Sequence, residues 1–176
     1  PAIPLYNGYK PFEQIPFQWS LHIKRTEKEI KLEHYEFIMA EAIDPVNEFL
    51  SNLQKVVGRV GSIIVWNSSF EATQNKKMAE KSSEYKDFCI NMNGRIFDLM
   101  KIFKSRIYVD PKAKGSDSIK KVLPAICPDY SYSSMEIGDG STAMISWYEM
   151  VYGEMDDSEK EKIKRNSTMI QKWNEE

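Results

Sequence analysis

The stretch SIIVWNSSFE, residues 62–71, places a carboxylate shortly after an apolar run. The run 63–66 is typical of a buried strand, and the helix predicted after it carries Glu71 in its first turn. In α/β folds, the end of a strand and the first turn of the next helix face one crevice, where oxygen ligands can hold divalent ions. Taken alone, Asn67 and Glu71 are also ordinary choices for a helix cap and for an acid near a helix N-terminus.

Other residues with reactive side chains give weaker signals. No glycine-rich phosphate loop, dinucleotide-binding motif, zinc-protease motif or hydrolase nucleophile motif is present. His22 and His34 fall on predicted strands, where a cross-strand or surface histidine is favoured over a metal ligand or a base. Cys89 and Cys127 lack metal-ligand spacing, which favours buried free thiols in a reducing compartment.

Length and composition indicate one globular domain over residues 1–176. The chain is 41% hydrophobic, which suits a single core. Its formal net charge of -2 gives no indication of a nucleic acid or an acidic membrane surface as a partner. No apolar run reaches membrane-spanning length and no leader opens the chain, so we expect a cytoplasmic protein. Because the chain starts at Pro1 without Met and stops inside a predicted helix, we also expect it to be a piece of a longer protein.

The N-terminal part of the chain predicts a β-hairpin followed by a helix. In 17–23 apolar and polar residues alternate with the period of a half-buried strand, and 31–39 returns as a second strand after a polar turn. Asp44 followed by Pro45 marks a helix start, and Gly58 marks its end. After the strand 62–66, we expect a polar helix over 69–81.

The remainder of the chain predicts mainly helices. An apolar stripe from Phe88 to Phe103 indicates one long helix, 106–110 is a candidate short strand, and Ser118 is the predicted cap of a helix bent or shortened by Pro124. A helix over 141–152 follows, and Ser158 is the predicted cap of a charged final helix. The order of elements is that of an α/β domain with a hairpin at one edge.

Three tryptophans occur at positions with the spacing of core residues, and we expect core positions for Trp19, Trp66 and Trp147.

Four segments together carry a resemblance to known families. They are QIPFQWSLH (14–22), NSSFE (67–71), IFDLMKIF (96–103) and SIKKVLPAICPDYSY (118–132). In this order they resemble a bacterial domain family of uncharacterised proteins. The NSSFE segment also resembles the second motif of the DEDD exonucleases of the ribonuclease H-like superfamily, with Glu71 where most relatives have Asp.

The resemblance implies a fold, an activity and cofactors. The fold would be a ribonuclease H-like mixed sheet flanked by helices. The activity would be a 3′ to 5′ exonuclease that hydrolyses phosphodiester bonds at a single-stranded 3′ end of DNA or RNA. Four acids would hold two Mg²⁺ or Mn²⁺ ions, which help to generate the attacking hydroxide and stabilise developing charge.

The resemblance also implies roles for individual residues. Glu71 would be a catalytic metal ligand, Asn67 would brace the turn, and Phe70 would anchor the helix in the core. Asp98 would be a further acid near the metals, although an acid on a helix surface is an equal alternative. Trp173 occupies the place of the family's water-orienting Tyr, and its indole N–H can donate a hydrogen bond but cannot accept a proton.

The chain departs from the exonuclease pattern at both ends. The first motif, Asp-x-Glu, would precede Pro1, and the last Asp would follow Glu176, so we expect these 176 residues to be inactive alone. The missing segment would be the central first strand of the sheet. Its absence would open a gap of two strand spacings, about 9.6 Å, so the sheet either closes abnormally or is poorly stable alone.

A lysine-rich stretch is the candidate nucleic-acid contact. Ser118, Lys120 and Lys121, with Lys112 and Lys114 before them, could track a phosphate backbone, although a solvated loop is the commoner explanation of such lysines. The alternative to an exonuclease is a non-catalytic module that binds nucleic acid or protein, or a purely structural interaction domain, because a fold does not dictate a function.

Overall fold

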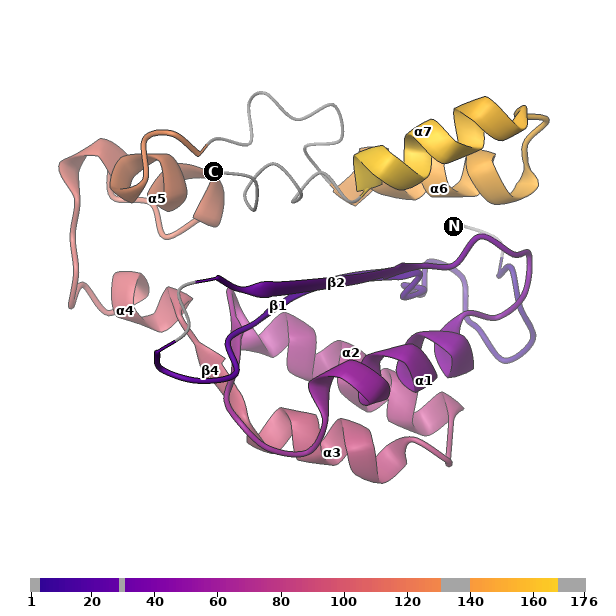
Figure 1. Ribbon diagram of the computed structural model, residues 1–176, viewed down its shortest axis with the longest axis horizontal. Helices are drawn as coiled ribbons and strands as arrows, with labels where there is room; N and C mark the ends of the chain where they lie inside the picture. Colours follow the sequence, from indigo (N-terminus) through magenta and orange to yellow (C-terminus); the bar gives the residue numbers. More distant parts are fainter. Residues whose placement is uncertain (1–3, 29–30, 131–139, 168–176) are drawn as a thin grey trace. The chain divides into compact units, whose positions relative to one another are not determined.

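The computed structural model describes residues 4–28, 31–130 and 140–167. They contain both helices and strands (Figure 1) and belong to two compact units. The first unit consists of 1–57 together with 139–176, and the second of 58–138. The prediction of a single domain over 1–176 stays a prediction. No helix of the described residues is long and apolar enough to cross a membrane.

The first unit contains the predicted hairpin. Strands β1 (Gln18–Ile23) and β2 (Glu33–Ile38) pair antiparallel, with Trp19 opposite Phe37 and His22 opposite His34. Their long pairing is visible in Figure 1. The period-2 pattern predicted this arrangement correctly, because alternation places every second side chain on the same face of a strand.

Three helices complete the first unit: α1 (Val46–Val57), α6 (Gly140–Tyr152) and α7 (Asp157–Ser167). The Asp44 carboxylate accepts a hydrogen bond from the Val46 amide at 3.1 Å, which confirms the predicted start of α1. Trp147 of α6 is buried, stacks on Phe17 and donates from its indole nitrogen to the Met39 carbonyl at 2.7 Å. This bond fixes α6 to the end of β2.

The second unit begins with a parallel strand pair joined by two helices. Strand β3 (Ile63–Val65) leads into α2 (Ser68–Lys81), which packs side by side with α3 (Lys86–Gly94), and β4 (Ile96–Asp98) returns parallel to β3. Parallel strands require such a crossover, which helices usually provide. The buried residues of these two helices are Met78 on α2 and Phe88, Cys89 and Met92 on α3.

Three short elements end the second unit: α4 (Met100–Lys104), the 3₁₀ helix η1 (Pro111–Ala113) and α5 (Ile119–Ile126). Ala113, Val122 and Ala125 form a small buried cluster, and the half-buried rings of Trp66 and Phe103 pack against it. The predicted helix after Ser118 is therefore confirmed, and it is short, with Pro124 inside it.

Three local predictions were wrong. The stripe from Phe88 to Phe103 is not one helix, because α3 ends at Gly94 and 96–98 pairs with β3 instead. Residues 106–110 form no strand. The last helix is capped by Asp156, which accepts from the Glu159 amide at 2.8 Å while Glu159 accepts from the Asp156 amide at 3.2 Å.

The described strands form two separate sheets of two strands each. Because β3 pairs with β4 and not with the hairpin, these strands do not show the abnormal closure predicted for a sheet that lacks its central strand. Poor stability of the isolated chain and a ribonuclease H-like sheet both stay predictions.

Candidate functional site

The candidate site is the turn that connects β3 to α2. Asn67 adopts the left-handed conformation with φ of 80°, which Asn tolerates better than most residues that carry a side chain. Its side-chain oxygen accepts a hydrogen bond from the Ser69 hydroxyl at 2.6 Å and does not cap the helix. Asn67 contributes to the geometry of the turn through its conformation and through this local bond.

The buried carboxylate of Asp98 holds this turn in place from the neighbouring strand. Asp98 ends β4, opposite Val65 at the end of β3. One of its oxygens accepts from the backbone amides of Asn67 (3.2 Å) and Met100 (3.1 Å). The other accepts from the amide and the hydroxyl of Ser68, at 3.0 and 2.8 Å. A carboxylate has about four acceptor sites, so these four bonds use the capacity of Asp98.

The hydrogen bonds of Asp98 decide the direction in which its pKa is shifted. Burial by itself raises the pKa of Asp98, but the bonds from Ser68, Asn67 and Met100 outweigh this effect and hold the pKa below its ordinary value. The carboxylate also lies at the start of α2, where the helix dipole favours a negative charge. Asp98 is thus an acid that positions the turn, and it lies on a strand rather than on a helix surface.

Glu71 has the opposite environment. Its half-buried side chain lies in the first turn of α2, as predicted, and it makes no hydrogen bond or ion pair with any residue that the structure describes. Burial raises the pKa of Glu71 above its ordinary value. A partly desolvated carboxylate without a partner is costly for folding, and such groups concentrate at functional sites.

The first turn of α2 is also held from α3. The side-chain nitrogen of Asn93 donates to the Ala72 carbonyl at 3.2 Å, while its oxygen accepts from Asn75 at 2.8 Å. These bonds restrain the backbone directly after Glu71. Sequence reasoning missed Asn93 and the capping role of Asp98, since both depend on contacts between segments about 20 to 30 residues apart.

The other predicted site residues lie elsewhere. Phe70 is 48% exposed, so its predicted role as a core anchor is wrong: α2 is held by Asp98 and Asn93 instead. Ser118 precedes α5, and the exposed side chains of Lys120 and Lys121 lie in the first turn of that helix. The Ser118 side chain makes no capping hydrogen bond. Trp173 lies outside the described residues.

The described side chains fit a metal site only in part. Within residues 4–28, 31–130 and 140–167, no group of three or more His, Cys, Asp and Glu side chains is arranged to hold a metal ion. Glu71 is a candidate ligand, whereas the oxygens of Asp98 are committed to the turn. A two-metal site at Glu71 would therefore need acids from outside the described residues.

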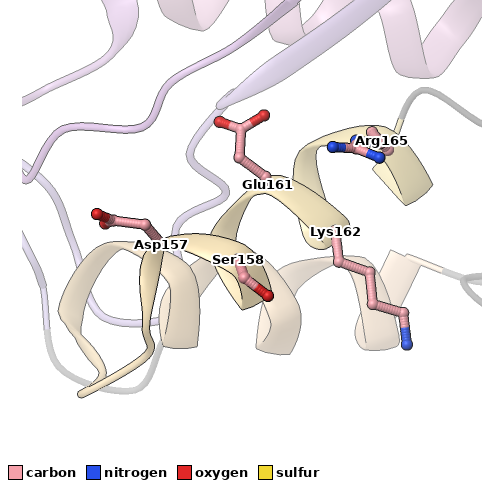
Figure 2. A pocket seen from close by; sticks show the side chains of 5 residues that line it. All are labelled: Asp157, Ser158, Glu161, Lys162 and Arg165. Carbon is pink, nitrogen blue, oxygen red and sulfur yellow. The ribbon is translucent and has the colours of Figure 1, made fainter.

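We assign no function to a surface hollow along α7. Its lining comes from one helix and mixes both charges, and Figure 2 shows these side chains: Asp157, Ser158, Glu161, Lys162 and Arg165. Binding sites for small molecules usually enclose most of the ligand, and side chains from one helix cannot do this.

Comparison with known proteins assigns a family. Residues 1–118 match the family described as a domain of unknown function, DUF2779. The chain belongs to this family. It is also 30% identical, over 157 residues, to an uncharacterised protein, UU173, of Ureaplasma parvum serovar 3. That match covers 79% of this chain and 23% of the relative, so the chain spans about a quarter of the relative's length. No solved structure matches the chain.

Proposed function

We propose that this DUF2779 chain forms part of a metal-dependent 3′ to 5′ exonuclease with a ribonuclease H-like core. The observation that carries the proposal is the environment of Glu71. Its carboxylate is half-buried, lacks a partner among the described residues and follows the carboxyl end of a parallel strand. Ligands and metal ions bind preferentially at such strand ends.

The proposal gives each residue of the turn a separate task. Asp98 fixes the backbone of residues 67 and 68, and Asn67 provides the left-handed residue from which α2 departs. Glu71 is left to bind a divalent cation, and its charge, disfavoured by burial, would be compensated there. When bound, Mg²⁺ or Mn²⁺ would supply an activated water and stabilise charge on the phosphate.

The order of the family-like segments gives further support, since the segments 14–22, 67–71, 96–103 and 118–132 resemble the family as a series. The remaining acids would come from outside the described residues. The resemblance implies that they belong to an Asp-x-Glu segment and to a final Asp. The match covers only 23% of the relative, which therefore contains further segments. Single-stranded DNA or RNA would enter past Ser118, Lys120 and Lys121.

The test is digestion of a 5′-labelled single-stranded oligonucleotide by the full natural protein that contains this chain. We expect shortening from the 3′ end that requires Mn²⁺ and is lost in Glu71→Gln. Glu80→Gln is the matched control, because Glu80 is an exposed carboxylate near the other end of α2. Unchanged digestion by Glu71→Gln would refute the assignment of Glu71.

The second candidate is a non-catalytic module that binds nucleic acid or protein. The observation in its favour is that the described residues contain no group of acids able to hold a metal. It predicts that the full protein binds single strands in the presence of a chelator, with equal affinity in the Glu71→Gln variant, and releases no nucleotides when Mn²⁺ is added.

A further inference from the structure

Residues 101–114, here called the basic segment, concentrate positive charge. They include five cationic residues and one acid, a net charge of +4 in a chain whose formal net charge is -2. The other residues therefore carry -6 together. The cations are Lys101, Lys104, Arg106, Lys112 and Lys114. Because the net charge of the basic segment is opposite in sign to that of the rest of the chain, the segment is a candidate surface for an anionic partner.

These cations are available for such a partner. All five side chains are exposed. None of the four lysines makes an ion pair with any residue in the described part of the chain. The acid of the segment, Asp110, makes no ion pair with these lysines in the described part of the chain; its carboxylate accepts a hydrogen bond from the Lys112 amide at 2.8 Å at the start of η1.

The backbone that carries the cations is held in a defined shape. Arg106 donates to the Gly115 carbonyl at 3.1 Å, which links the two ends of the loop 106–115. The indole of Trp66 donates to the Asp117 carbonyl at 3.1 Å and packs on Phe103 with ring centroids 5.1 Å apart. Binding to a preorganised surface loses less conformational entropy than binding to a flexible loop.

An exposed aromatic ring lies among the cations. Tyr108 is 46% exposed and rests edge-on against Phe103, with ring centroids 5.7 Å apart and an interplanar angle of 76°. Its apolar neighbours Ile107 and Val109 are 78% and 58% exposed. In sequence, three cations precede Tyr108 and two follow it. Proteins that bind single strands combine cations for the phosphates with an aromatic face for the bases.

We propose that the basic segment binds single-stranded nucleic acid, with its lysines on the phosphates and Tyr108 stacked on a base. It extends the predicted contact at Ser118 and Lys120 toward the N-terminus, because η1 packs against α5. Insertion into an anionic membrane surface through an amphipathic helix fits less well, because residues 105–110 are not helical. The preference for nucleic acid rests in part on the proposed function.

The test measures binding of a fluorescent oligothymidylate to the full natural protein that contains this chain by anisotropy, in a chelator and over a range of salt concentrations. Without metal no digestion occurs, so the result does not depend on the proposed exonuclease. Lys104→Gln combined with Lys112→Gln removes one cation from each side of Tyr108. Lys24→Gln combined with Lys28→Gln is the matched control, because it removes the same charge from exposed lysines of the hairpin turn.

We expect the first double variant to reduce the slope of log K against log salt by about 1.4, since each phosphate contact on a single strand contributes about 0.7. The control should leave the slope unchanged. Tyr108→Leu, which keeps an apolar contact with Phe103, should weaken binding roughly 5- to 140-fold. The proposal is overturned if the full protein does not bind, if both double variants behave alike, or if vesicles of anionic lipid bind while the oligonucleotide does not.

Discussion

Replacement of Asp98 by Asn tests whether this acid holds the turn that presents Glu71. The carboxylate oxygens each accept two hydrogen bonds, three of them from backbone amides. An Asn side chain would put an N–H₂ group where one of these oxygens is, so at least one amide would lose its acceptor. The buried position leaves little room for water to replace it.

The expected loss follows from these bonds. An unsatisfied buried N–H costs about 1–3 kcal/mol, and the surviving bonds become weaker when the acceptor loses its charge. The favourable interaction with the start of α2, about 0.3–1 kcal/mol, is also lost. We expect Asp98→Asn to lower the free energy of unfolding of the second unit by about 2–4 kcal/mol, a large share of typical domain stability.

The dependence on pH provides a second signature. Because the pKa of Asp98 is lowered in the folded state, its stabilisation is present above the ordinary value of 3.8 and is lost as the pH falls through the lower folded-state pKa. The wild-type chain should therefore lose this contribution on acidification, whereas Asp98→Asn should lack that part of the acid sensitivity.

Urea denaturation followed by tryptophan fluorescence gives the free energy, and hydrogen exchange at the amides of Asn67, Ser68 and Met100 localises it. Asp129→Asn is the control, since Asp129 is exposed and its variant should stay within about 0.5 kcal/mol of wild type. The reasoning is refuted if Asp98→Asn unfolds with the same free energy as Asp129→Asn and retains protection at these amides.

Three further predictions concern other contacts. Arg95→Met removes hydrogen bonds to the carbonyls of residues 58, 60 and 61 and should lower the free energy of unfolding of the second unit by about 1–3 kcal/mol. An unchanged midpoint of urea denaturation would contradict this. Trp147→Phe leaves a buried carbonyl without its donor and should lower the melting temperature of the first unit, at a cost of about 2–4 kcal/mol; calorimetry checks it against exposed Tyr148→Phe. Burial raises the pKa of the Cys89 thiol to about 11, so iodoacetamide at neutral pH should modify Cys89 only after unfolding. Peptide mapping by mass spectrometry separates Cys89 from the half-buried Cys127, and rapid modification of Cys89 in the folded chain would contradict the prediction.

The main local elements could be predicted because they depend on short-range patterns. Alternation specified the hairpin, and Asp44 with Pro45 specified the start of α1. The short distance in sequence between the predicted strand and Glu71 placed this residue in the first turn of α2. Each of these predictions uses residues that are neighbours in the chain, so backbone geometry suffices to relate them.

The failed prediction of one long helix from Phe88 to Phe103 concerns a choice between two local patterns that fit equally well. The spacing of Phe88, Met92, Ile96 and Phe103 suits a helix, yet 96–98 also suits a strand, and pairing with β3 decides in favour of the strand. Gly94 ends α3 just before this segment. Periodicity in a short apolar segment cannot separate the two cases, because the deciding hydrogen bonds come from a distant strand.

The sequence by itself therefore determined the start of α1, the pairing of the hairpin and the position of Glu71 in the first turn of α2. Only the tertiary structure decided that Asp98 is an acceptor for the turn at Asn67 and Ser68, while Glu71 keeps a carboxylate without a partner among the described residues. Both residues are acids near strand or helix ends, and their types are nearly the same. Their difference arises from which donors the paired strands and packed helices bring within hydrogen-bond distance, and that is a property of long-range contacts.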